Sequence, residues 1–75
     1  MRIKVGQYVE VRMNGYIREG EIKDILIGTT AQDPAGESGV NVTEYDTELN
    51  YQGSIAYGKG YWAYFDQIME VTSAD

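Results

Sequence analysis

Cysteine and histidine are both absent from this chain of 75 residues. Without cysteine, no disulfide can stabilise the fold and no thiolate can bind a metal ion. Without histidine, the chain lacks the side chain that most often serves as a general base and as a transition-metal ligand. The serine and threonine hydroxyls have no imidazole to activate them, so we expect no enzyme, no bound cofactor and no metal.

Long apolar runs are also absent. The chain has no stretch of about 18 apolar residues, so we expect no membrane-spanning helix. No apolar segment follows Arg2 and Lys4, so we expect no signal peptide either. These two absences predict a soluble, cytoplasmic protein without membrane contact. The length suits a single domain spanning residues 1–75.

Basic residues are scarce: six lysines and arginines stand against 12 acidic residues, for a formal net charge of −6. Beyond residue 27 the only basic residue is Lys59. Binding to phosphates by counterion release needs a concentrated basic surface, and this chain does not have one overall. We therefore do not expect general nucleic-acid binding. A local basic patch in the first third is the alternative, formed by Arg2, Lys4, Arg12, Arg18 and Lys23.

The most ordered pattern lies between residues 6 and 27. Apolar and polar residues alternate over residues 7–13, which is typical of a strand with one buried face. Asn14-Gly15 predicts a tight hairpin turn, unless residues 14–20 form one irregular loop. A second strand is predicted over residues 21–27, either with a bulge near Asp24 that bends it or with both faces covered by a partner chain.

The remaining elements are shorter. Residues 1–5 predict a short strand or a terminal arm. Two long loops are predicted at about residues 28–39 and 46–60, the second with a short β-segment near residues 54–57. Further strands are predicted over residues 40–45, with Val40 and Val42 facing inward, and over residues 61–65 and 69–72. Between the last two, a single helical turn is expected with Asp66 as its cap.

Three segments together resemble the SH3-like small barrels, the group that includes KOW, Tudor and SH3 domains. They are Gly6-Gln7-Tyr8-Val9-Glu10-Val11, Gly20-Glu21-Ile22 and Tyr61-Trp62-Ala63-Tyr64-Phe65-Asp66-Gln67-Ile68. The resemblance implies an all-β, five-stranded barrel with one helical turn before the last strand. The chain departs from KOW domains in lacking a compact basic character, and from SH3 domains in lacking their acidic loop and proline site. The resemblance therefore implies the fold and not those functions.

Aromatic residues are the best candidates for a functional surface. Seven tyrosines stand against one phenylalanine and one tryptophan, and tyrosine suits half-buried positions where its hydroxyl reaches water or a partner. On the strand at residues 61–65 we expect Tyr61 and Phe65 to face inward and Trp62 and Tyr64 to face outward. The candidate binding residues are Trp62, Tyr64, Tyr8, Tyr57 and Tyr16. The alternatives are rings that cover the barrel ends or that lie in an oligomer interface.

Two weaker patterns have simpler interpretations. Glu44, Asp46 and Glu48 would share one face of a strand, as a weak cation site or, more simply, as a solvated edge that discourages aggregation. Gly58-Lys59-Gly60 lacks the spacing of a phosphate-binding loop and predicts a flexible turn.

The sequence thus predicts a non-enzymatic interaction or assembly module that contacts an unknown protein partner, or a second copy of itself, through exposed tyrosine and tryptophan. The alternative is a KOW-type accessory barrel that associates with nucleic acid. A third is a subunit of an enzyme whose active site lies on another chain.

Overall fold

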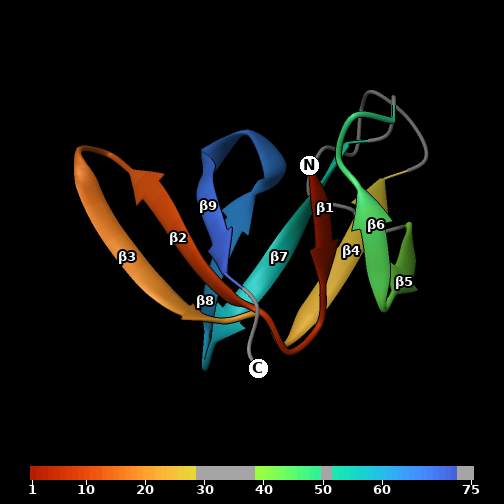
Figure 1. The fold of residues 1–75 in the computed structure, drawn as a ribbon, viewed down its shortest axis with the longest axis horizontal. Helices are drawn as coiled ribbons and strands as arrows, with labels where there is room; N and C mark the ends of the chain where they lie inside the picture. Colours follow the sequence, from red (N-terminus) through yellow and green to blue (C-terminus); the bar gives the residue numbers. More distant parts are fainter. Residues whose placement is uncertain (29–38, 50–51, 73–75) are drawn as a thin grey trace.

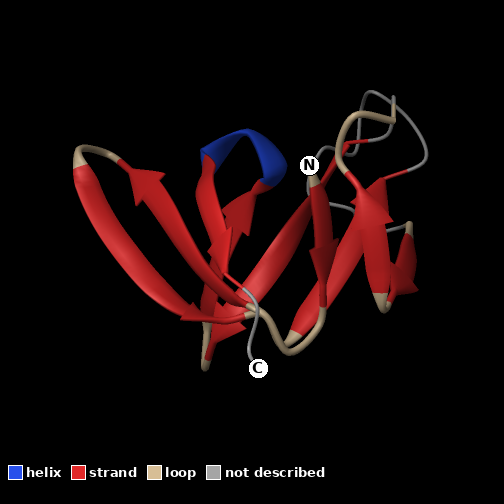
Figure 2. Ribbon diagram, viewed as in Figure 1, coloured by secondary structure: helices blue, strands red, loops and turns tan. Residues whose placement is uncertain are grey.

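The computed structural model describes residues 1–28, 39–49 and 52–72, and these residues form an all-β fold with one 3₁₀ turn, η1 (Figures 1 and 2). The elements in chain order are β1 (Arg2–Lys4), β2 (Tyr8–Met13), β3 (Tyr16–Glu21), β4 (Asp24–Gly28), β5 (Val40–Val42), β6 (Glu44–Asp46), β7 (Gln52–Gly58), β8 (Tyr61–Tyr64), η1 (Phe65–Gln67) and β9 (Ile68–Thr72). Most of the first predicted loop, residues 29–38, lies outside the described residues.

The strands form three antiparallel sheets, ordered β1-β6, β3-β2-β9 and β5-β4-β7-β8. The all-β class is as predicted. The single closed barrel of five strands is not what the described residues form, because they hold nine strands in three separate sheets. Two of the predicted strands are each divided by a short connection, and this accounts for part of the difference.

The β2–β3 hairpin is tight, as the first alternative predicted. Asn14 and Gly15 both have positive φ, 51° and 85°, which is the backbone of a two-residue turn that matches the twist of paired strands. Val9 and Val11 are almost fully buried, whereas Tyr8 and Arg12 on the opposite face are exposed. In Figure 1 the hairpin projects from the rest of the molecule, with β3 on its outer side.

The predicted strand over residues 21–27 is divided. β3 ends at Glu21 and β4 begins at Asp24, with Ile22 and Lys23 between them. The amide of Ile22 donates to the Gln7 carbonyl at 2.8 Å, and the amide of Lys23 donates to the Ala56 carbonyl at 2.7 Å. The chain therefore passes from one sheet to another at this point. Both Ile22 and Ile25 are fully buried, which fits the predicted change of direction near Asp24.

The predicted strand over residues 40–45 is also divided, into β5 and β6. Val42 packs against the core, but Val40 is 48% exposed, so its predicted inward orientation is wrong. Val40 is opposite the buried Ile27, but it is the first residue of the edge strand β5 and remains exposed at the margin of the core. Tyr45 on β6 is buried and stacks on Phe65, with ring centroids 5.5 Å apart.

The second predicted long loop contains the longest strand. β7 takes up half of residues 46–60 and pairs with β4 on one side and β8 on the other. Residues 53–57 are all buried, so both faces of this strand are covered. The predicted β-segment near residues 54–57 is therefore confirmed in position, but the strand is longer than predicted.

The segment from β8 to β9 follows the predicted order of strand, helical turn and strand. Ala63 is buried and Phe65 packs against the core. Tyr61, predicted to face inward, is 51% exposed. Asp66 lies inside the turn instead of capping it. Gln67 stabilises the start of the turn, because its Oε1 accepts the Tyr64 amide at 2.8 Å.

A single hydrophobic core joins the three sheets. Its fully buried members come from β1, β2, β4, β7 and the connection between β3 and β4. They are Ile3, Val9, Val11, Ile22, Ile25 and Ile55. The sheets approach closely at Gly20, where an added Cβ would lie 2.1 Å from the Tyr57 carbonyl oxygen. Only glycine fits β3 against β7 at this position.

Candidate functional site

The site that best fits a ligand or partner is a pocket beside β8 and η1, with a volume of about 490 Å³. This size lies within the range of ligand-binding clefts. Most of its lining is apolar or aromatic, and it includes both outward-facing rings of β8. The lining residues are Met13, Leu26, Ser54, Trp62, Ala63, Tyr64 and Gln67.

The alternation of large and small side chains on β7 and β8 shapes this pocket. Tyr64 is opposite Ser54 and Trp62 is opposite Ala56 in the antiparallel pair. Cross-strand partners lie on the same face of a sheet, so two rings stand beside two small residues. Ser54 and Ala56 are only 4% and 7% exposed. Ser54 therefore forms a low floor beside an aromatic wall of Trp62 and Tyr64, while Ala56 lies outside the pocket lining.

The aromatic wall is accessible, as the sequence predicted. Trp62 is 42% exposed and Tyr64 is 46% exposed. The bond from the Tyr64 amide to Gln67 Oε1 ties the end of β8 to η1. The two rings therefore project from a strand whose backbone is held at both ends, by β7 pairing and by the 3₁₀ turn.

The pocket has the chemistry of a binding surface. None of the described residues that line it is charged, so these residues offer no acid–base group. Tryptophan and tyrosine bury large apolar areas on contact and keep a polar atom at the ring edge. Such a surface suits uncharged, apolar side chains, with the Ser54 hydroxyl and the Gln67 amide as the polar groups that orient them.

Tyr57, predicted as part of the binding surface, is buried at 4% exposure, and this prediction is wrong. Its hydroxyl donates to Met13 Sδ at 3.2 Å, and its ring stacks on Tyr61 with centroids 5.9 Å apart. The inward parity of residues 53, 55 and 57 on β7 puts this ring in the core. Because this segment has the composition of a loop, its sequence does not show which of its side chains face inward.

Tyr8 and Tyr16 are exposed but lie on the hairpin and do not line the pocket. Tyr16, at 68% exposure, follows the turn. Tyr8 lies on the outer face of β2. Partial desolvation raises the pKa of its hydroxyl. The Glu19 carboxylate, through its charge and as a hydrogen-bond acceptor, and the Glu10 carboxylate raise that pKa further.

Five of the described lining residues are not among those that the sequence indicated: Met13, Leu26, Ser54, Ala63 and Gln67. Met13 and Leu26 lie on β2 and β4, far from β8 in the chain, whereas Ser54 lies on β7, which directly precedes β8. Ser54 pairs with Tyr64 in the β7–β8 hairpin, and Leu26 reaches the pocket because β4 pairs with β7 and places it opposite Ser54. The excess of tyrosine indicated the aromatic wall, but no local pattern indicated its floor.

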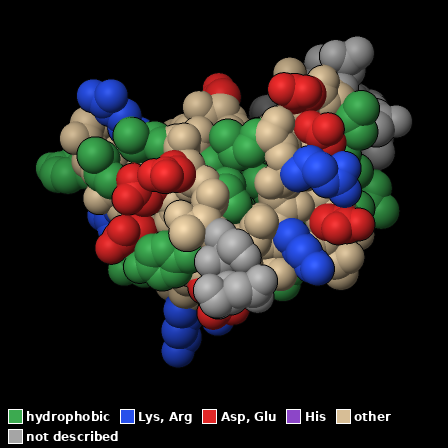
Figure 3. All heavy atoms as spheres, in the orientation of Figure 1, with side chains coloured by type: hydrophobic (Ala, Val, Ile, Leu, Met, Phe, Trp, Pro, Cys, Tyr) green, Lys and Arg blue, Asp and Glu red, His purple; other side chains and the backbone are tan. Residues whose placement is uncertain are grey.

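The basic residues of the first third do not form one patch. Arg2 lies 3.8 Å from Glu44, and Lys23 lies 3.4 Å from Glu21. Arg18 lies over the Tyr61 ring. The basic side chains visible over β1 in Figure 3 lie among acidic ones. A phosphate backbone would therefore meet no continuous basic surface on these residues.

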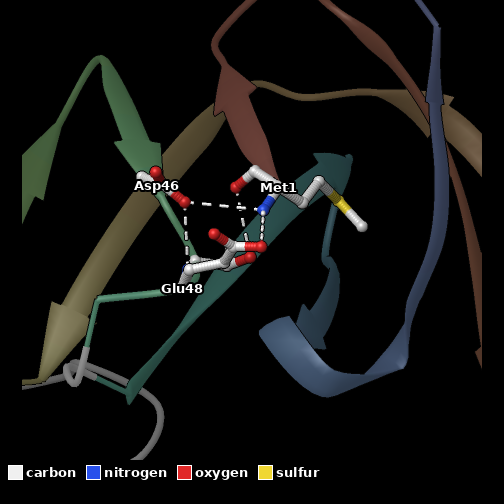
Figure 4. Close-up of polar contacts among 4 residues, drawn as sticks. Met1, Asp46 and Glu48 are labelled. Atoms are coloured by element: carbon white, nitrogen blue, oxygen red, sulfur yellow. Dashed lines mark hydrogen bonds and ion pairs between the residues drawn. The ribbon is translucent and has the colours of Figure 1, made fainter.

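Of the three acids Glu44, Asp46 and Glu48, the last two contact the Met1 amine (Figure 4). The Met1 amine lies 3.4 Å from Asp46 Oδ1 and 3.6 Å from Glu48 Oε1. The Glu48 amide donates to Asp46 Oδ1 at 3.0 Å, and this bond, followed by the Met1 amine and Arg2, lowers the pKa of the Asp46 carboxyl. Among the residues that the structure describes, no three potential ligands are grouped as a metal site.

No helix in the described part of the chain is long and apolar enough to cross a membrane. The chain matches no protein-family model, no curated protein and no solved structure.

Proposed function

We propose that this protein is a non-enzymatic interaction module that receives an uncharged, apolar segment of a partner protein against Trp62 and Tyr64. The observation that carries the proposal is a pocket of about 490 Å³ in which two exposed rings, Trp62 and Tyr64, stand beside the buried Ser54. Aromatic anchors beside a shaped pocket are typical of the energetic centres of protein interfaces.

The arrangement favours a partner over a second copy of the chain. The net charge of −6 adds long-range repulsion between copies. The part of the pocket lining that the structure describes is uncharged, so an apolar segment can contact it without an unpaired charge being buried. The resemblance to SH3-like barrels is part of this proposal. It is supported by the 3₁₀ turn before the last strand and by the pairing of that strand, β9, with β2.

The test uses Trp62 as its own reporter, because it is the only tryptophan in the chain. Wild-type protein and the variant Trp62→Ala/Tyr64→Ala are immobilised and exposed to an extract of the native host. Each protein retained by the wild type is then purified and titrated against it. We expect at least one partner whose retention falls tenfold or more in the double variant and whose binding shifts Trp62 emission to shorter wavelength.

Tyr16→Ala is the matched control, since it removes an exposed ring outside the pocket. Equal retention by wild type and double variant, with unchanged Trp62 emission, would refute the proposal. A dimer in light scattering that the double variant abolishes would show instead that a second copy fills the pocket.

A further inference from the structure

β3 is an edge strand whose outer side is unpaired among the described residues, although near its end Gly20 lies close to β7. It pairs only with β2, and Figure 1 shows it on the outside of the projecting hairpin. Tyr16 and Ile17 are 68% and 62% exposed, on opposite faces of the strand. An exposed strand edge of this kind is a template for another strand.

The direction of the backbone groups on this edge follows from one hydrogen bond. The Ile22 amide donates to the Gln7 carbonyl on the β2 side. Because these groups alternate in direction along an antiparallel strand, the amides and carbonyls of Ile17, Glu19 and Glu21 point away from β2. Three residues therefore present donors and acceptors to an added strand.

Two of these residues, Glu19 and Glu21, carry acidic side chains, and Glu21 already lies 3.4 Å from Lys23 Nζ. Glu19 is opposite Glu10, and Glu10 is opposite Glu70, so one row of glutamates crosses the three strands. Like charges directly opposite each other destabilise a sheet. Figure 3 shows acidic side chains gathered over this half of the molecule. A cation opposite Glu19 on an added strand would extend this row with the opposite charge.

The molecule already contains the complementary arrangement. On β1 and β6, Arg2 is opposite Asp46 and Lys4 is opposite Glu44, so a strand with alternating bases pairs with a strand with alternating acids. β3 carries the same acidic alternation at Glu19 and Glu21 and has no basic strand beside it among the described residues.

A second copy of β3 does not fit this edge. Cross-strand partners must share a face, and the two longest antiparallel registers place either Arg18 opposite Arg18 or Glu19 opposite Glu19. Both registers bring like charges into contact. The edge therefore favours a different strand over its own.

We propose that β3 accepts an extended segment of a partner protein that carries lysine or arginine at alternate positions. The segment adds an antiparallel strand to the sheet, with its cations opposite Glu19 and Glu21. A β-branched residue of the segment lies opposite Ile17. This surface is separate from the β8 pocket, so the inference does not depend on the proposed function.

The probe is the synthetic peptide Lys-Thr-Lys-Thr-Val-Thr with blocked ends, and the measurement is calorimetric titration together with amide shifts in NMR. We expect binding that perturbs the amides of Ile17, Glu19 and Glu21. The control peptide Lys-Lys-Thr-Thr-Val-Thr has the same charge and composition but loses the alternation. It should bind at least threefold more weakly.

Two kinds of variant separate charge from backbone pairing. Glu19→Gln should weaken binding about three- to tenfold, whereas Asp66→Asn, which removes one charge on η1, should change it less than twofold. Ile17→Pro removes an outward amide without breaking the β2–β3 pairs and should abolish binding. If this variant fails to fold, the peptide N-methylated at alternate residues serves the same purpose.

The proposal is overturned if the peptide does not bind, if the scrambled peptide binds equally well, or if binding survives the loss of the backbone groups. Equal binding of the two peptides would mean electrostatic adsorption only. Trp62→Ala should leave the affinity for the peptide unchanged, so failure of one proposed surface leaves the other testable.

Discussion

The guanidinium carbon of Arg18 lies 5.3 Å from the centroid of the Tyr61 ring. Tyr61 in turn stacks on Tyr57, so the projecting hairpin is connected to the four-stranded sheet through a cation and two rings. A cation over an aromatic face contributes about 0.5–1 kcal/mol at exposed sites. This contact explains why a half-exposed tyrosine is held in place at the start of β8.

The Arg18–Tyr61 contact predicts a measurable coupling. In a double-mutant cycle of Arg18→Met and Tyr61→Leu, we expect a coupling energy of about 0.5–1 kcal/mol from urea unfolding. The control cycle pairs Arg12→Met, on the opposite face of the hairpin, with Tyr61→Leu, and should be additive. Additivity in both cycles would show that the Arg18 contact does not stabilise the fold.

Gly20→Ala should destabilise the protein by at least about 1–3 kcal/mol, since the new Cβ meets the Tyr57 backbone and not a flexible side chain. Chemical denaturation with circular dichroism gives the free energy of unfolding. Glu21→Ala, at an exposed neighbouring position, is the control and should cost much less. Equal stability of the two variants would contradict the close approach of β3 and β7.

Glu10→Gln should stabilise the protein by about 0.2–1 kcal/mol, because Glu10 lies between Glu19 and Glu70 in the acidic row. The gain should shrink at high salt, which screens the repulsion. Glu44→Gln is the control, as Glu44 is opposite Lys4, and it should give no stabilisation. A gain from Glu10→Gln that salt does not alter would have to come from a cause other than charge.

Asp46 predicts a loss of stability in acid. Its pKa is lowered in the folded state by the Glu48 amide and then by the Met1 amine. The ionised Asp46 carboxylate therefore makes its full contribution to the free energy of unfolding above the unfolded pKa of about 4. This contribution disappears as the pH falls through the lower pKa of the folded state. Unfolding measured from neutral to acidic pH should show the wild type losing stability relative to Asp46→Asn in this window. Parallel curves would exclude the effect.

Tyr8 predicts the opposite dependence, in alkali. Its pKa is raised by partial desolvation and by Glu19 and Glu10, so its contribution to stability is present below the unfolded pKa of about 10 and is lost as the pH rises through the folded value. Ultraviolet titration, with Tyr8→Phe to assign the signal, should show a lower pKa for Tyr8 in Glu19→Gln. Glu44→Gln, on another sheet, should leave this pKa unchanged.

The sequence predicted the elements whose side chains alternate clearly. Val9 and Val11 indicated β2, and Asn14-Gly15 indicated the turn, because both signals are local. The exposure of Trp62 and Tyr64 followed from the same alternation on β8. These predictions needed no knowledge of which strands are neighbours.

The elements that were missed depend on long-range packing. β7 is rich in small residues, with Gly53, Ser54, Ala56 and Gly58 in seven positions, and such a composition normally indicates a loop. The small residues are needed because other chain segments lie close on both faces, as at Gly53 beneath the Phe65 ring. Likewise, the floor of the β8 pocket depends on the order of β4, β7 and β8, which no local pattern encodes.

The enclosure of β7 has a consequence for how the molecule opens. Its two edges are hydrogen-bonded to β4 and β8 and its two faces are covered, so its amides can exchange with solvent deuterium only when the whole assembly of sheets comes apart. The hairpin tip at Asn14 and Gly15 has no such enclosure and can exchange through local fluctuations. The protein should therefore show its slowest hydrogen exchange in the segment that looks least ordered in its sequence.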